Sequence, residues 1–294
     1  MKSTWTATAV VWGARVAWLG VAVFGGIAVE AALDGRSDAV SWVSTVGGWV
    51  LWALVALALA IASVRSLTVA RLLVPLGVAA TIAVMIGGAG ALQVATLGLP
   101  VLIATFAVFT AEFGRYFVQA SAYGDEERFP LRAPAAAGAA AVVTWVAWAA
   151  CLITGPLLLA AGSWIAGALL SVLAIAGAVY FGPRWHRLAQ RWLVLVPAGV
   201  VVHDPVVLAD TVTLRTAQVA GIRLAPADTG AADLTGPASG YAVEIGLTES
   251  ITAVYAFTPS APNGTAIHLT AMLVAPSRPG ETLAAADRRG LPVR

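Results

Sequence analysis

Long apolar runs without any charged residue fill the first part of the chain and predict membrane-spanning helices. Residues 39–64, 72–111 and 133–183 contain no Asp, Glu, Lys or Arg. A helix needs about 20 apolar residues to cross the hydrocarbon core of a bilayer. The first run therefore predicts one span and each longer run predicts two. In the second run, the glycine cluster at 87–90 is the expected site of reversal.

An earlier apolar segment, residues 3–32, contains two charged side chains, Arg15 and Glu30. The 14 uncharged residues between them are fewer than a span needs. We therefore expect the two charges to lie near opposite interfaces, with the Arg15 side chain extending to the membrane surface. A cleaved signal peptide is the alternative, but no clean A-x-A site follows the apolar run. With this segment, the sequence predicts six transmembrane helices.

The composition supports membrane residence and limits the partners. Hydrophobic residues make up 60% of the chain and charged residues only 11%, against roughly 25% in typical soluble domains. The net charge of +2 implies no bulk attraction to nucleic acid. The single cysteine, Cys151, lies in an apolar run and is expected to be a small buried hydrophobe rather than a reactive thiol.

The basic residues predict the orientation of the spans. The ends and loops expected in the cytoplasm contain Lys2, Arg15, Arg65, Arg71, Arg115, Arg128, Arg132, Arg184, Arg187 and Arg191, and the outer loops contain only Arg36. Cytoplasmic segments typically carry such an excess. The bias of the basic residues toward Arg is typical of a GC-rich bacterial genome. The sequence therefore predicts a multi-pass protein of the bacterial inner (plasma) membrane with both termini in the cytoplasm.

From residue 184 the pattern changes to period-two alternation, which predicts a mainly β domain of about seven strands. The expected strands are 192–196, 199–203, 211–215, 218–224, 241–247, 251–257 and 266–274. A turn is expected at Asn263-Gly264, between the last two strands. A C-terminal helix is expected over 279–289, because Pro279 suits a helix start and Gly290 suits a helix end. The predicted domains are a six-helix transmembrane domain, 1–183, and a cytoplasmic β-rich domain, 184–294.

The segment RWLVLVPAGVVVHDPVVLADTVTLRTAQVAGIRLAP, residues 191–226, resembles the opening strands of bacterial pleckstrin-homology-like (PH-like) domains. An apolar strand, a turn with Gly199, a second strand and a polar-flanked third strand follow one another in it. The resemblance covers only the tail, and it implies a binding or assembly module rather than a catalytic one. The helical part resembles no transporter or enzyme family.

Six charged side chains are candidates for the membrane boundary: Arg15, Glu112, Arg115, Arg184, Arg187 and Arg191. Glu112 and Arg115 have i,i+3 spacing and form either a solvated interfacial pair or part of a coupling site. They begin a segment of mixed aromatic and charged residues, 112–133, that is expected to lie along the interface. From Leu193 onward, six basic and eight acidic residues give a net charge of −2, which argues against a site for anionic lipid in the tail.

No catalytic, cofactor or metal site is predicted. The adjacent His203 and Asp204 precede Pro205 and are expected in a turn, and the three histidines are isolated from one another. The leading hypothesis is a non-enzymatic membrane protein whose tail acts in assembly or regulation of a membrane complex, through a protein partner or self-association. A small-molecule transporter or channel with a regulatory cap is the alternative. A membrane-embedded enzyme acting on lipids is a third hypothesis.

The predicted topology places Arg36 in the outer loop between the first two spans. A cysteine at this position, in a Cys151→Ala background, is expected to react in intact cells with a thiol reagent that does not cross the membrane. Reaction only after the cytoplasmic side is opened to the reagent would contradict the topology.

Overall fold

The computed structural model describes residues 2–256 and 264–294. The chain divides into two compact units. One comprises Met1–Phe117 with Val142–Trp185, and the other Val118–Ala141 with His186–Arg294. The predicted turn at Asn263-Gly264 lies partly outside the described residues, as does the end of the strand predicted at 251–257.

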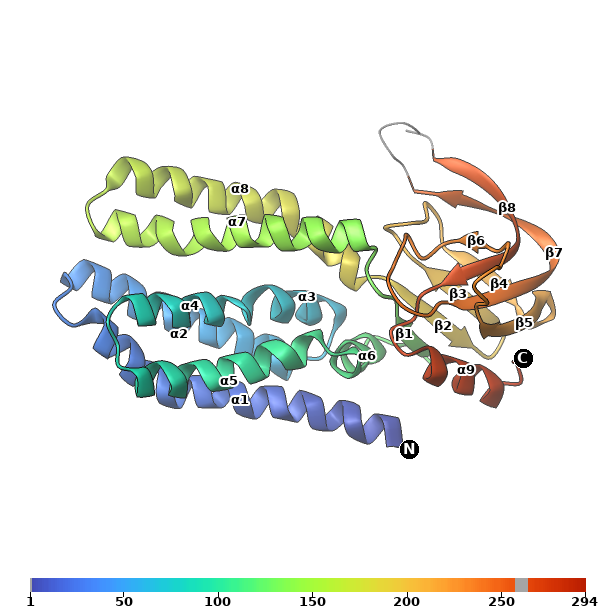
Figure 1. Cartoon of the computed structure of the whole chain (residues 1–294), viewed down its shortest axis with the longest axis horizontal. Helices are drawn as coiled ribbons and strands as arrows, with labels where there is room; N and C mark the ends of the chain where they lie inside the picture. Colours follow the sequence, from blue (N-terminus) through green and yellow to red (C-terminus); the bar gives the residue numbers. More distant parts are fainter. Residues whose placement is uncertain (1, 257–263) are drawn as a thin grey trace. The chain divides into compact units, whose positions relative to one another are not determined.

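The first unit is helical, and it confirms the six predicted spans (Figure 1). The helices are α1 (Lys2–Leu33), α2 (Asp38–Ala60), α3 (Val64–Leu73), α4 (Leu76–Ile86), α5 (Ala91–Phe109), α6 (Ala111–Gln119), α7 (Ala135–Ala160) and α8 (Trp164–Ala189). Of these, α3 and α4 together form one span, Val64–Ile86, and α6 is short. The break between α3 and α4 falls at Val74-Pro75, where proline supplies no backbone N–H.

Small residues let the membrane helices approach one another closely. A Cβ atom at Gly77 of α4 would lie 3.0 Å from Val101 of α5. Between α7 and α8 the backbones themselves meet, because a Cβ at Gly155 would lie 2.8 Å from the backbone nitrogen of Ser171. A Cβ at Gly167 would lie 2.6 Å from the backbone nitrogen of Leu159. Close contact through small residues is the usual basis of helix association in lipid, where no hydrophobic force drives it.

The second unit consists of two four-stranded sheets and a helix. The strands are β1 (Glu127–Pro130), β2 (Trp192–Val196), β3 (Gly199–His203), β4 (Val212–Arg215), β5 (Val219–Leu224), β6 (Ala232–Asp233), β7 (Val243–Tyr255) and β8 (Thr265–Val274), and the helix is α9 (Pro279–Arg288). The sheet orders are β1-β2-β3-β4 and β5-β7-β8-β6. The strands predicted at 241–247 and 251–257 are one strand, β7, whose register with β8 shifts between Gly246 and Ile251.

The turn between β2 and β3 depends on a glycine. Two residues, 197 and 198, join the strands, and Gly199 follows with a φ of +148°. A Cβ at Gly199 would lie 1.9 Å from the carbonyl oxygen of Leu214 on β4. Only glycine therefore allows the chain to turn here while β4 pairs with β3.

Strand β1 comes from the segment that sequence analysis expected along the membrane interface. It pairs antiparallel with β2 and places Phe129, which is 1% exposed, in the core of the β unit. Acidic residues beside it bind α9, where Arg289 contacts Asp125 at 2.8 Å and Arg288 contacts Glu127 at 3.3 Å. A strand of four residues ending in proline is too short to show a period-two pattern, so the sequence did not reveal it.

Arg191, one of the predicted interface charges, has its side chain in the interior of the β unit. It is 1% exposed and lies inside the β unit, where Nε and Nη2 donate to the two carboxylate oxygens of Asp204 at 2.7 and 2.6 Å. Its guanidinium also donates to the backbone carbonyls of Arg132 and Thr235. Arg191 therefore forms a buried structural ion pair with Asp204, and its location near the membrane boundary stays a prediction. Its position after the last span made a topology signal the simpler interpretation.

Removal of the Asp204 charge tests this structural role. Asp204→Asn leaves the Arg191 guanidinium buried without its counterion, a change that typically costs about 3–5 kcal/mol. We expect hydrogen exchange in β2 and β3 of the full-length protein to show a corresponding loss of protection. Asp125→Asn is the matched control, since the Asp125 side chain is 78% exposed and its pair is expected to contribute no more than about 1 kcal/mol. Equal effects of the two variants would contradict the structural role.

Candidate functional site

Arg15, the charge inside the first span, binds the end of a neighbouring helix. Its Nε donates to the carbonyl oxygen of Leu59 at 2.9 Å, and its guanidinium carbon lies 4.9 Å from the centre of the Trp12 ring. Leu59 and Ala60 end α2, where the last carbonyls have no partner within the helix and the dipole is negative. Arg15 therefore caps α2, which gives this charge a structural role within the helical unit.

The other predicted interface charges lie on two helices. Arg184 and Arg187 are exposed near the end of α8, and the Arg184 guanidinium stacks 3.7 Å over the ring of Tyr180. Glu112 and Arg115 are half-buried on α6, and each is engaged in an interaction. That helix is amphipathic, and two buried phenylalanines, Phe113 and Phe117, stack at 4.4 Å on its apolar face. The location of these four charges at a membrane surface stays a prediction.

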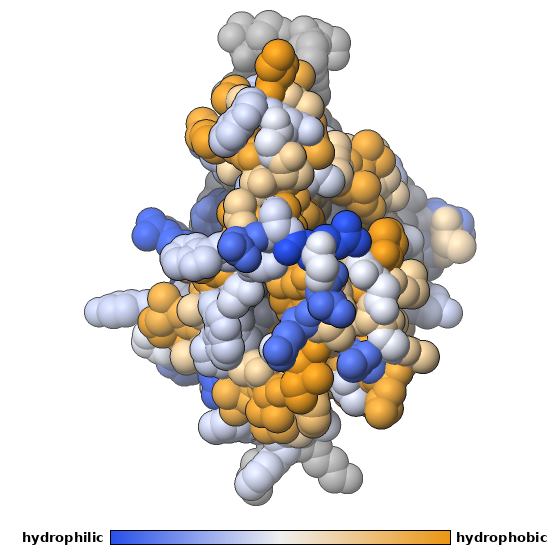
Figure 2. Space-filling view, turned by 90° about the vertical axis from the view of Figure 1, so that its left-hand side faces the viewer, coloured by the Kyte–Doolittle hydropathy of each residue, from blue (hydrophilic) through white to orange (hydrophobic). Residues whose placement is uncertain are grey.

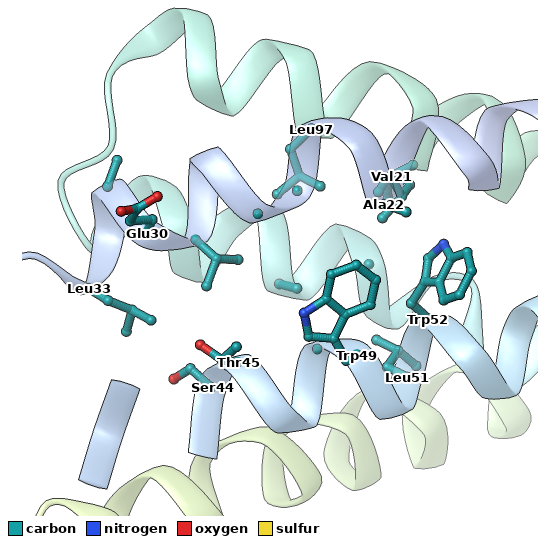
Figure 3. Close-up of a pocket in the computed structure, with 18 of the residues that line it drawn as sticks. Val21, Ala22, Glu30, Leu33, Ser44, Thr45, Trp49, Leu51, Trp52 and Leu97 are labelled. Atoms are coloured by element: carbon teal, nitrogen blue, oxygen red, sulfur yellow. The ribbon is translucent and has the colours of Figure 1, made fainter. Parts of the chain in front are cut away.

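A cavity of about 880 Å³ lies between α1, α2, α4 and α5 (Figure 3). The residues that line it are Trp18, Val21, Ala22, Gly25, Gly26, Val29, Glu30, Ala31, Leu33, Asp34, Gly35, Ser41, Ser44, Thr45, Gly48, Trp49, Leu51, Trp52, Gly77, Ala80, Leu97 and Val101. All of them belong to the helical unit. Its volume lies within the range of roughly 300–1,000 Å³ that small-molecule sites occupy.

Polar groups gather at one end of the cavity. Glu30 projects from the last turn of α1, and Ser44 and Thr45 lie opposite on α2 (Figure 3). The cavity is partly open at this end and Glu30 is exposed; within the part of the chain that the structure describes, its carboxylate has no hydrogen bond or ion pair. This is the α1–α2 loop end of the helices, which Figure 2 faces and where hydrophilic side chains gather in the middle of the surface among apolar ones.

A pair of tryptophans closes the apolar end. The indole Nε1 of Trp18 on α1 donates to the carbonyl oxygen of Trp52 on α2, and Nε1 of Trp52 donates to the carbonyl of Trp18, both at 3.0 Å. Trp49 meets Trp52 edge-on, with ring centres 5.8 Å apart. The two reciprocal hydrogen bonds join α1 to α2, and the two indole side chains form the apolar end of the cavity.

The space beside the tryptophans exists because glycines face it. A Cβ atom at Gly26 of α1 or at Gly48 of α2 would meet no other atom within 4 Å. This site was not predicted from the sequence. The available signals were the two glycine pairs, 25–26 and 47–48, in consecutive predicted spans, together with Glu30 near the end of the first. Glycine pairs are equally compatible with tight helix contacts, so the pattern alone does not distinguish a cavity from an interface.

The titratable groups of the β unit are engaged in structural contacts. His203 stacks on Trp192 with ring centres 5.0 Å apart, and its Nδ1 lies 2.9 Å from the hydroxyl of Thr211. Burial lowers the pKa of His203, while the neighbouring Asp204 opposes that shift. Hydrogen bonds from Thr229 and Arg223 lower the pKa of Glu244, although its burial acts in the opposite sense.

In the described part of the chain, no three His, Cys, Asp or Glu side chains lie together in a group that could hold a metal ion. The predicted turn at His203-Asp204 is confirmed, because the Asp204 carboxylate accepts from the backbone N–H groups of Val206 and Val207.

Comparison with protein-family models, with curated proteins and with solved structures finds no match to this chain. Its class therefore follows from its own architecture, which is that of a polytopic helical membrane protein with a C-terminal β-rich unit.

The paired indoles allow a direct test of how the cavity is held. Trp52→Phe removes one of the two hydrogen bonds between α1 and α2, and hydrogen bonds between membrane helices contribute about 0.6 kcal/mol on average and up to roughly 1.7 kcal/mol. We expect a lower midpoint of thermal unfolding for the full chain in detergent. Trp49→Phe is the matched control, because Trp49 lines the same cavity without an indole hydrogen bond in the described structure. A control that unfolds as early as Trp52→Phe would contradict this role.

Proposed function

We propose that this chain is a non-enzymatic integral membrane protein whose β unit acts in the assembly or regulation of a membrane complex. The unit has a hydrophobic core of its own, which includes Leu195, Val202 and Ile245, and it is followed by a C-terminal helix. The resemblance to PH-like domains implies about seven strands and one C-terminal helix, and the described part of this unit has eight strands in two sheets and a C-terminal helix. We propose that this unit is PH-like and lies in the cytoplasm of a bacterium, with the six spans in the inner membrane and both termini on the cytoplasmic side.

The observation that carries the proposal is an open strand edge on β8. Strands β7 and β8 pair along their length, from Val243↔Val274 to Tyr255↔Thr265. On the other side of β8, β6 pairs only with Met272 and Leu273. Among the described residues, no strand pairs with the outer edge of residues 265–270. Such an edge presents backbone donors and acceptors to an added strand, which is a common mode of protein recognition.

The charges of the β unit favour a protein partner over anionic lipid. Arg223 is bound to Glu244 at 2.7 Å, and Arg288 and Arg289 are bound to Glu127 and Asp125 beside β1. Arg191 is buried with Asp204. Sites for anionic head groups use clusters of roughly four to eight basic residues. At least five of the ten arginines of this unit, Arg128, Arg191, Arg223, Arg288 and Arg289, neutralise acids of the same unit, which supports protein contact through the strand edge.

A second candidate function is small-molecule transport by the six helices. The observation that favours it is the cavity between α1, α2, α4 and α5, which contains a carboxylate without a partner in the described structure. Arg15, the charge inside the first span, caps α2 and does not line this cavity. Flux of a solute into vesicles that requires Glu30 would favour this second function.

Site-specific photocrosslinking tests the assembly function. A photoreactive amino acid at His268, an exposed position on β8, is expected to capture a defined protein partner or a second copy of this chain in the membrane. The same group at Asp228, which is exposed in a loop of the same unit, is the matched control and is expected to capture little. Mass spectrometry of the adducts identifies the partner.

Truncation after α8 provides an independent comparison. A chain that ends at Ala189 keeps all six spans and lacks β2–β8 and α9. Partners of the full chain are expected to be lost with this truncation. Partners that persist in the truncated chain, or equal capture at positions 268 and 228, would move the function into the helical unit.

A further inference from the structure

The cavity of the helical unit has a polar end and an apolar end, and this division indicates what kind of molecule fits it. Glu30, Ser44 and Thr45 lie at the polar end, and Trp49 and Trp52 lie further along α2 (Figure 3). A polar solute would leave the tryptophan-lined part unfilled, and a hydrocarbon would leave the carboxylate unpaired. The molecule that satisfies both ends is an amphiphile with a polar head and an apolar chain.

The length of the cavity corresponds to one leaflet of a bilayer. Trp18 and Glu30, at its two ends, are twelve residues apart on α1, which at the rise of an α-helix is about 18 Å. One leaflet contributes about 15 Å of the hydrocarbon core. An acyl chain that lies parallel to α1 therefore reaches from the tryptophan pair to the helix end, and its head group is then level with Glu30.

The charge of the lining selects the head group. The charged side chains that line the cavity are Glu30 and Asp34, both of them acidic. Hydroxyl groups of Ser41, Ser44 and Thr45 lie on the facing helix. Two carboxylates repel an anionic head group, whereas a primary ammonium donates charge-assisted hydrogen bonds to them. The hydroxyl groups are suitable donors for phosphate or ester oxygens of the same molecule.

We propose that this cavity binds one membrane lipid whose head group carries a primary amine, with phosphatidylethanolamine as the simplest example. The ammonium lies at Glu30, the phosphate or ester oxygens lie near the hydroxyls of α2, and one acyl chain packs against Trp49 and Trp52. The lipid enters from the leaflet on the side of the α1–α2 loop. This site is independent of the β unit and of the proposed assembly function.

Lipid photocrosslinking in nanodiscs tests the proposal with the full-length protein. Two probes are compared, phosphatidylethanolamine and phosphatidylglycerol, each with the same photoreactive group on one acyl chain. We expect the amine-bearing probe to label peptides of α1 and α2 that line the cavity, and to do so several times more strongly than the anionic probe, because differences of this size need only about 1 kcal/mol.

Two neighbouring glycines provide the matched variants for the acyl chain. Gly48 lines the cavity and Gly47 does not, yet both are exposed on α2 and a Cβ at either position meets nothing within 4 Å. Gly48→Leu places a branched side chain in the part of the cavity beside the tryptophans and is expected to lower labelling of its peptides about tenfold, whereas Gly47→Leu leaves the labelling unchanged. Should Gly48→Leu fail to fold, Gly26→Leu tests the same space from α1, with Gly13→Leu as its control.

Glu30→Gln tests the head group separately. It is expected to lower the preference for the amine-bearing probe about threefold to tenfold, because a charge-assisted hydrogen bond to the ammonium is lost and the repulsion of the anionic head group is reduced. Asp38→Asn is the control, because Asp38 is an exposed acid at the start of α2 that does not line the cavity.

Three outcomes would overturn the proposal. One is equal labelling by the two lipid probes, which would indicate bulk lipid in a shallow groove. Another is the same labelling in Gly48→Leu and Gly47→Leu. The third is crosslinking of the cavity peptides to a second copy of the chain, or their protection by a water-soluble amine instead of a lipid. None of these depends on whether the β unit has a partner.

Discussion

The hydrocarbon core of a membrane contains no water to satisfy backbone polar groups, and much of the helical unit follows from this constraint. Each helix ends in carbonyl groups without a partner inside the helix. Arg15 supplies donors to the end of α2, and Arg71 donates to the carbonyl of Val108 at 3.0 Å near the end of α5. Arginines are energetically costly inside apolar spans. These two offset that cost by donating hydrogen bonds to the unpaired carbonyl groups at the ends of neighbouring helices. Indole groups do the same along the helices, as in the reciprocal Trp18 and Trp52 pair.

The interior of the β unit also excludes water, and a buried ion pair between Arg191 and Asp204 satisfies polar groups there. The Arg191 guanidinium contacts both oxygens of Asp204 and two backbone carbonyls, and Asp204 in turn accepts from the turn after β3. Such a network joins β2, the turn after β3 and the loop that contains Thr235. A buried pair of this kind adds little net stability over apolar packing, but loss of either partner is costly. It therefore specifies one arrangement of these segments more than it strengthens the fold.

The regular elements could be predicted because their patterns are long. Uncharged runs indicated the spans, and two short apolar runs joined at Pro197-Ala198 indicated β2 and β3, whose bounds 192–196 and 199–203 agree with the structure. Short or non-local features could not be predicted. The four residues of β1 are too few to show an alternating pattern. The strand that pairs with them, β2, lies more than sixty positions away in the chain. The burial of Arg191 depends on Asp204. The predicted β2–β3 hairpin places the two residues opposite one another, but its apolar pattern does not show whether charges just beyond the hairpin ends are buried or exposed.

Glycine shows most clearly why the candidate site was beyond sequence analysis. At Gly155 and Gly167 the absence of a side chain lets α7 and α8 touch through their backbones, whereas at Gly26 and Gly48 it leaves empty space between α1 and α2. The difference arises from the neighbours. The bulky Trp18 and Trp52 pair sets the spacing of α1 and α2 at one level, so glycines on the adjoining turns cannot close the gap. With α1 and α2 held apart in this way, the Glu30 carboxylate lies at the open end of the cavity between them. Its negative charge favours a cationic group of a bound molecule over an anionic one.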